Sequence, residues 1–179
     1  FHLKNFEVSA GLQALREWEL TAPPAPVPNS RLDILHLDLA EMCRQLAGAE
    51  ESKPHGLDLL RFRVPLERTP ERRVEAAIDL TSGLEKAGDV SGALAALHSA
   101  LSHDNPETEY SPDGITHLSS AAYIKDKIKS LRASVTNPET LFSKIHADAL
   151  DALKEARKQG SPTAFLDVLR LYPLTPAAA

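Results

Sequence analysis

The sequence predicts an all-α fold: antiparallel helical hairpins stacked as a short α-solenoid, preceded by an N-terminal helix and a proline-rich strap. Apolar residues recur at helical intervals over most of residues 30–172, and no segment alternates for long with the period of a strand. Of the 179 residues, 42% are hydrophobic but only 5% are aromatic, so leucine and alanine dominate, as they do in packed helix pairs. At four places a capping residue precedes a proline, which is typical of helix starts.

The N-terminal region, residues 1–29, is predicted to be distinct from a helical-repeat domain at residues 30–179. A helix at about 8–20 carries Trp18, the only tryptophan. The segment Thr21–Asn29 holds four prolines in nine residues, so we expect an extended strap without internal hydrogen bonds. Two interpretations stay open for the region: a packed edge helix with a loop, or an arm that grips a partner.

The repeat domain is predicted to begin with a helix at residues 30–47. Ser30 is its expected cap, and Asp33 lies three residues further on, in a variant of the capping box. The apolar stripe of this helix includes Cys43, and because it is the only cysteine, an internal disulfide and a multi-cysteine metal site are excluded. We expect a buried, inert thiol. Residues 49–68 are predicted to form an irregular connection whose leucines are buried against the helices.

The central stretch, Ala77–Ala100, predicts two helices, at 70–87 and 90–104, separated by one Gly-Asp step. Gly88 suits a left-handed helix end, and Asp89 can cap the helix that follows. So short a connection sets two helices side by side and antiparallel. Because a lone hairpin cannot bury its apolar stripes, we expect stacked neighbours and a surface made for binding.

Particular residues of this hairpin follow a repeat pattern: Leu80, Gly83, Leu84, Lys86, Ala87, Gly88, Ala93, Leu94, Leu97 and Pro106. On these residues the hairpin resembles a pentatricopeptide repeat, a unit of organellar proteins, and the related tetratricopeptide repeat fits nearly as well. The likeness covers about a fifth of the chain. An ordinary helical hairpin is the alternative. The resemblance implies the mitochondrial matrix, and the start at Phe1 fits a removed presequence.

Three further helices are predicted at 114–135, 138–158 and 162–172, each after a capping residue and a proline. The repeat signal among them is weak. Glycines at 48, 88 and 160 are spaced by about one and two repeat periods, but the turn expected near residue 124 is absent. The array is therefore degenerate, or it contains one genuine unit.

The motifs of catalysis are missing from the sequence. It has no glycine-rich phosphate loop and no Gly-x-Ser-x-Gly elbow, and no histidine pair shows the spacing of a zinc helix. We therefore predict a protein that is not an enzyme and needs no cofactor or metal. No apolar run reaches the ~18 residues of a membrane span, so none is expected.

Charge bears on the choice of partner. The formal net charge of −5 disfavours a groove for nucleic acid, which must neutralise phosphates. A lysine-rich cluster at the end of the 114–135 helix is explained by the helix dipole and solvation. A second basic cluster precedes and opens the central hairpin. This cluster consists of Arg61, Arg63, Arg68, Arg72 and Arg73. These five arginines and Trp18 are the residues predicted to bind a partner.

The family resemblance can be tested at one position. Pentatricopeptide proteins read single-stranded RNA through a polar residue on the first helix of each unit, and the matching residue is Asp79. Readers at this position are usually Asn, Ser or Thr, so an anionic Asp disfavours base recognition. We therefore expect a structural subunit that binds other protein subunits of a large mitochondrial assembly, such as the catalytic head of ATP synthase. The alternatives are an organellar RNA-binding protein and a bacterial tetratricopeptide adaptor.

Overall fold

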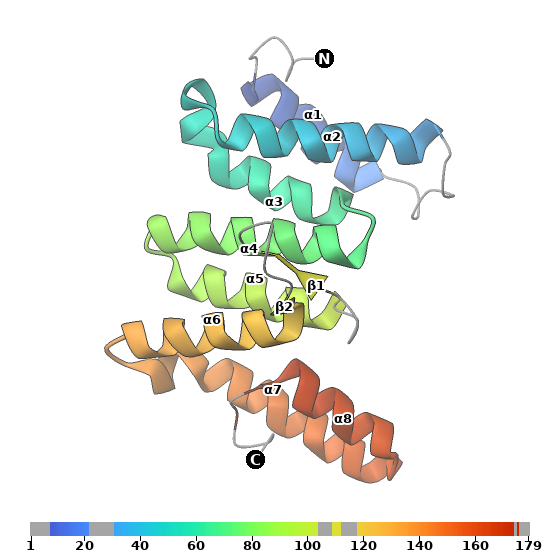
Figure 1. Cartoon of the computed structure of the whole chain (residues 1–179), viewed down its shortest axis with the longest axis vertical. Coiled ribbons are helices and arrows are strands. Elements are labelled where there is room, and N and C mark those ends of the chain that lie inside the picture. The colour runs from blue at the N-terminus through green and yellow to red at the C-terminus, as the bar shows by residue number, and fades with distance from the viewer. Residues whose placement is uncertain (1–7, 22–30, 104–108, 112–117, 174, 176–179) are drawn as a thin grey trace. The chain divides into compact units, whose positions relative to one another are not determined.

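The structure is a computed structural model that describes residues 8–21, 31–103, 109–111, 118–173 and 175. Helices make up most of these residues (Figure 1), which confirms the predicted all-α class. The chain divides into two compact units, residues 1–88 and 89–179, and we describe each by itself. The division lies at the Gly-Asp step of the central hairpin, whereas the sequence predicted a boundary after residue 29.

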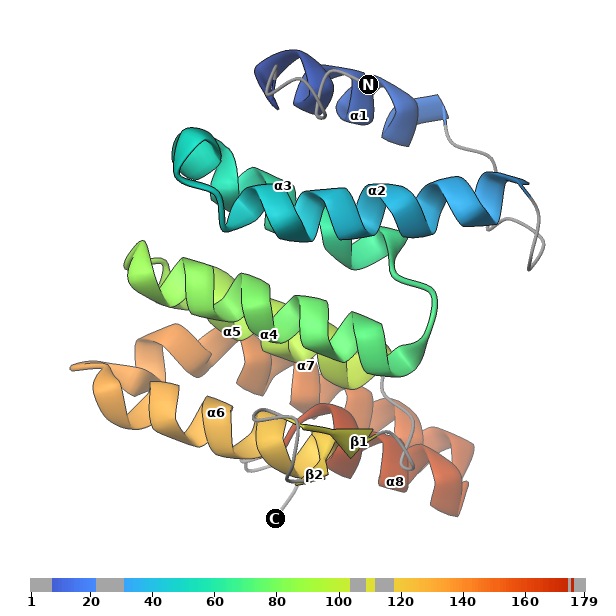
Figure 2. The same ribbon diagram turned by 45° about the horizontal axis from the view of Figure 1, so that its top comes forward.

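In the described residues of the first unit, the regular secondary structure is helical. Its elements are α1 (Val8–Thr21), α2 (Arg31–Ala47), the 3-10 helix η2 (Glu50–His55), α3 (Gly56–Leu66) and α4 (Pro70–Lys86). α3 packs against both α2 and α4. Figure 2 shows α1 lying over the pair formed by α2 and α3.

The apolar stripe of α1 explains why this helix belongs to the first unit. Val8, Leu12 and Leu15 recur at helical spacing and are buried. They form one hydrophobic core with residues of α2 and α3, Cys43 and Leu59 among them. α1 is therefore a packed helix, while the predicted strap falls on residues 22–30, outside the described part of the chain.

The prediction of an irregular connection at residues 49–68 is wrong, because the structure places η2 and α3 there. Two features of the sequence hid α3. Pro65 lies inside the helix, close to its end, and an arginine occupies a position on the apolar face. The buried residues Leu59, Arg63 and Leu66 recur at intervals of four and three, which is the helical pattern once the arginine is counted as an interior residue.

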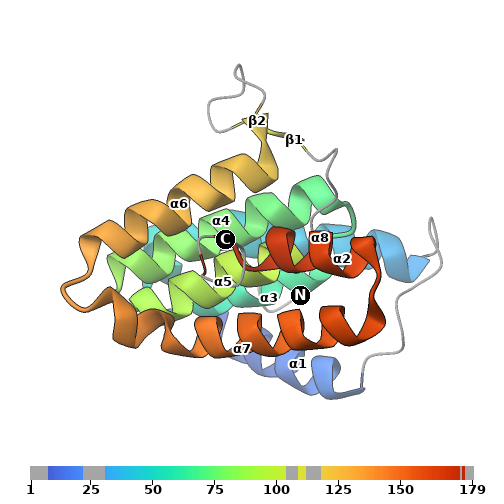
Figure 3. The ribbon, with the colours of Figure 1, turned by 90° about the horizontal axis from the view of Figure 1, so that it is seen from below.

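The second unit contains α5 (Val90–His103), the strands β1 (Glu109–Tyr110) and β2 (Leu118–Ser119), α6 (Ser120–Ser134), α7 (Pro138–Gln159) and α8 (Pro162–Leu171). α5 packs against α6 and α8, and Figures 1 and 3 show α7 and α8 side by side. The buried residues of the second unit come from α5, α6, α7 and α8, and they include Leu97, Ile128, Ala149 and Val168.

The helix predicted at 114–135 begins later than expected, at Ser120. Leu118 and Ser119 instead pair with β1 in an antiparallel ladder, Tyr110 opposite Leu118. The ring of Tyr110 lies 4.7 Å from that of Tyr123, centroid to centroid, which packs the ladder on the first turns of α6. The expected proline start at Pro112 lies outside the described residues.

The predicted caps of the two helices of the central hairpin are confirmed. The Arg72 N–H bonds to Thr69 Oγ1 at 3.3 Å, at the start of α4. At the start of α5 the Gly92 N–H bonds to Asp89 Oδ1 at 2.8 Å. Gly88 has φ of 79°, in the left-handed region that the sequence predicts for this helix end.

Candidate partner-binding surface

Three of the five arginines predicted to bind a partner lie around one residue, Glu67, which follows the last residue of α3. Arg63 Nε donates to Glu67 Oε1 at 2.8 Å, and Arg73 Nε donates to the Glu67 carbonyl at 2.9 Å. Arg72 Nη1 lies 4.0 Å from Glu67 Oε2. These contacts fix the end of α3 against the start of α4.

Arg63 is the most enclosed member of the set, with a side chain only 2% exposed. Besides Glu67 it pairs with Glu75, at 3.3 Å, and with Asp79, both on α4. Burial acts to lower the pKa of Arg63, but the hydrogen bonds and charges of Glu67 and Asp79 raise it overall. The guanidinium therefore stays charged and links α3 to α4 from within the unit. It is not placed to meet a partner.

Arg68 makes a second internal contact, toward α2. Its Nε lies 3.1 Å from Asp33 Oδ1, and its Nη2 contacts His36 Nδ1. The Arg68 side chain is 19% exposed. Burial, and then the charge of Arg68, lower the pKa of His36, so this histidine is neutral in the folded protein at neutral pH.

Two arginines of the predicted set remain on the surface. The side chains of Arg61 and Arg72 are 52% and 54% exposed. Arg61 Nη1 lies 3.3 Å from Asp58, which also pairs with Arg16 of α1 at 3.2 Å. The side chain of Trp18, the other residue of the set, lies outside the described part of the structure.

Asp79, the residue that matches the base-reading position of a pentatricopeptide repeat, makes a contact within the first unit. Its carboxylate is paired with the buried Arg63 and is 44% exposed. An acidic residue here therefore has a structural reason, since it accepts a hydrogen bond from a buried guanidinium.

Sequence reasoning missed a groove of about 690 Å³ in the first unit, where the ends of α2 and α4 meet η2 and α3. Three cations line it: Arg44, Lys53 and Lys86. Gly83 lies on its α4 wall, and a Cβ added there would come within 2.9 Å of Leu57 Cδ2. The glycine thus allows α3 to approach α4 closely. In sequence the three cations are far apart, so only the fold brings them together.

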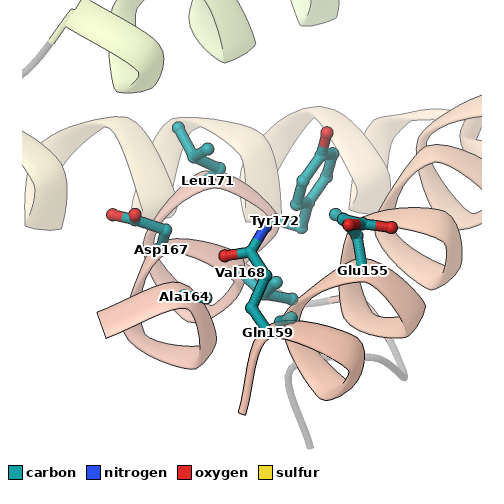
Figure 4. Close-up of a pocket in the computed structure, with 9 residues that line it drawn as sticks. Glu155, Gln159, Ala164, Asp167, Val168, Leu171 and Tyr172 are labelled. Carbon is teal, nitrogen blue, oxygen red and sulfur yellow. The ribbon is translucent and has the colours of Figure 1, made fainter. Parts of the chain in front are cut away.

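A smaller pocket, of about 250 Å³, lies between α7 and α8 in the second unit. Figure 4 shows Glu155 and Asp167 on opposite sides of it, with the Tyr172 ring between them. Each carboxylate is already paired within its own helix, Glu155 with Lys158 at 3.1 Å and Asp167 with Arg170 at 3.4 Å. The acidic groups of this pocket are therefore already neutralised by basic residues of their own helices.

Within the described ranges, no three histidine, cysteine or acidic side chains are grouped so that they could hold a metal ion. Nor does any described helix combine the length and the apolar character needed to cross a membrane, as predicted. In comparisons with known proteins, no family model matches the chain, and neither a curated protein nor a solved structure gives a significant match.

Proposed function

We propose that this chain is a non-catalytic accessory subunit that binds another protein within a large mitochondrial assembly, its hairpins stacked as a short α-solenoid. The likeness of the central hairpin to a pentatricopeptide repeat supports the organellar location, in the matrix. Size, acidity and repeat character also resemble those of the small accessory subunits of this type on the catalytic head of euglenozoan mitochondrial ATP synthase. That head is one candidate partner.

The observation that carries the proposal is the apolar surface of α8. Phe165, Leu166 and Leu169 are 37%, 62% and 45% exposed. Leu169 lies three residues after Leu166 and four after Phe165, and these are the spacings at which side chains neighbour each other on a helix surface. Apolar residues gathered in this way are typical of protein–protein contacts, since an RNA backbone offers them nothing to bury.

RNA recognition is the main alternative, and the arginines weaken it. Arg63, Arg68 and Arg73 are engaged inside the first unit, so they are not available to phosphates. Asp79, at the reader position, is engaged as well. If the chain nevertheless reads RNA, binding falls steeply with salt, and Asp79→Asn strengthens or redirects it.

The test is affinity purification of the tagged chain from its native source, with the co-purifying proteins identified. We expect a defined protein complex that survives nuclease treatment. The Leu166→Ser/Leu169→Ser double variant is expected to lose this complex, because it removes two exposed apolar contacts and leaves the buried side of α8 intact. Thr163→Ala, on an exposed position of the same helix, is the matched control and should keep it.

A titration of the purified chain with random single-stranded RNA at physiological salt decides between the two classes. Submicromolar affinity would overturn the proposal in favour of an RNA-binding protein. Weak binding, together with a nuclease-resistant complex that depends on the two leucines, supports it.

A further inference from the structure

We infer that one exposed face of α2 binds the same face of a second copy of this chain, with the two helices antiparallel. This α2 face consists of Arg31, Ile34, Leu35 and Asp38. It belongs to the first unit and is separate from the exposed apolar face of α8, which belongs to the second. A second copy is thus a partner additional to the protein subunits of the proposed function.

The apolar part of the α2 face lies on the side of the helix that points away from the core. Ile34 and Leu35 are 53% and 47% exposed, whereas His36 and Ala40 of the same helix are buried. Contact with another protein removes such apolar area from water. Two side chains form a small patch, however, so the apolar area alone does not identify the partner.

Charge identifies a second copy as the partner. Arg31 precedes the apolar pair by three residues and Asp38 follows it by three, so both lie on the same stripe of the helix as the pair. A cation thus stands at one end of the pair and an anion at the other, and both residues are exposed. The ion pairs that the structure describes on α2 engage Asp33, Glu41 and Arg44, and not these two residues.

A two-fold axis between Ile34 and Leu35 makes this stripe complementary to itself. Arg31 and Asp38 lie at equal distances from the midpoint of the apolar pair, about 5 Å along the helix axis in each direction. In an antiparallel arrangement, the axis therefore brings Arg31 of each copy opposite Asp38 of the other, and it gathers the four aliphatic side chains at the centre. A parallel arrangement would instead set Arg31 against Arg31 and Asp38 against Asp38, and like charges oppose it.

The size of the α2 face sets the strength of this contact. Two half-exposed aliphatic side chains and two charged ones bury much less than the about 800 Å² per partner of a standard interface. We therefore expect a weak dimer, with a dissociation constant on the order of 100 μM. Such a dimer forms where copies are held close together, as in an assembly that contains more than one of them.

The experiment is sedimentation equilibrium of the full chain over a concentration series up to about 1 mM, roughly ten times the expected dissociation constant. We expect reversible dimerisation that weakens as salt is raised, because ion pairs at the surface are screened. Arg31→Glu and Asp38→Arg should each weaken dimerisation about tenfold or more, because each replaces two attractive pairs by two repulsive ones. Both side chains are exposed, so the circular dichroism of the variants should match that of the original chain.

The decisive measurement is an equimolar mixture of these two variants. In a mixed dimer, the carboxylate introduced at position 31 faces the guanidinium introduced at position 38, and the native Asp38 and Arg31 face each other. Dimerisation should therefore return in the mixture. Attraction between oppositely charged proteins would not explain this result, because the formal net charge of −5 stays negative after either change.

Two controls separate the α2 face from other causes of association. Lys129→Glu, at an exposed position of α6, changes the net charge as Arg31→Glu does and should leave dimerisation unchanged. Leu166→Ser/Leu169→Ser removes exposed apolar surface from α8 and should also leave it unchanged. A chain that stays monomeric throughout the series would overturn the inference. So would equal weakening by Lys129→Glu, a mixture that fails to dimerise, or dimerisation that is lost with the two leucines of α8.

Discussion

Replacing Arg63 by methionine should be among the most destabilising single changes in the first unit. Methionine keeps most of the aliphatic length of arginine, so the main loss is electrostatic. Glu67 is left with a side chain 3% exposed and without its closest cation. Removal of one partner of a buried ion pair costs about 3–5 kcal/mol. Glu75 and Asp79, 46% and 44% exposed, remain hydrated and add little.

The measurement is urea unfolding of each variant, followed by far-ultraviolet circular dichroism. Arg61→Met is the matched control on the same helix. With a side chain 52% exposed, it should change the free energy of unfolding by less than about 0.5 kcal/mol. The double variant Arg63→Met/Glu67→Leu should recover at least half of the single-variant loss, because no buried charge is then left unpaired. A loss below about 1 kcal/mol for Arg63→Met, or no recovery in the double variant, would refute this reasoning.

Three further measurements test the interior. Leu97→Ala removes a side chain with no exposed surface, so it should lower the free energy of unfolding by about 2–5 kcal/mol. A decrease below about 0.5 kcal/mol would mean that Leu97 lies on the surface of α5 and not in the core. The folded-state pKa of His36 lies below its ordinary value of 6.5, so the unfolded chain takes up a proton first as the pH falls. The free energy of unfolding should therefore decrease below pH 6.5, and a pH series on His36→Gln should show a shallower decrease. Burial raises the pKa of the Cys43 thiol to about 12, so Ellman's reagent should label it only as the protein unfolds. Rapid labelling in buffer would contradict the structure.

The helices that the sequence predicted best are those with both a punctuated start and a continuous apolar stripe. α4 and α7 begin at the predicted residues, Pro70 and Pro138, because proline at the first helical position costs no hydrogen bond. α3 is not predicted by the sequence, although its leucines are expected to be buried. It lacks a capping residue, contains Pro65 and has Arg63 on its buried face, so each local rule pointed away from a helix. Tertiary packing against α2 and α4 outweighs those local preferences.

The candidate site was predicted only in part, because the sequence alone does not distinguish a buried arginine from an exposed one. Five arginines close together in sequence suggest one basic patch, but helical periodicity places some of them on the buried face and others on the exposed face. The exposed pair, Arg61 and Arg72, faces solvent, while Arg63 points into the unit. The groove could not be predicted at all, since its cations lie on three elements that only the fold brings together.

Arg63 also shows which signal separates a structural arginine from a binding one. It lies four residues after Leu59 and three before Leu66, on the buried face of α3. A charge at such a position needs a carboxylate within reach, and Glu67 lies four residues further on the same helix, the spacing at which side chains meet. The remaining N–H groups of the guanidinium have to be met from the facing helix, where Glu75 and Asp79 lie. Asp79, which departs from the base-reading pattern of pentatricopeptide repeats, is thus one of the carboxylates that pair with the buried arginine. The arginines inside the first unit therefore serve an internal ion-pair network, and contact with an anionic partner there would fall to the exposed arginines of the predicted set, Arg61 and Arg72.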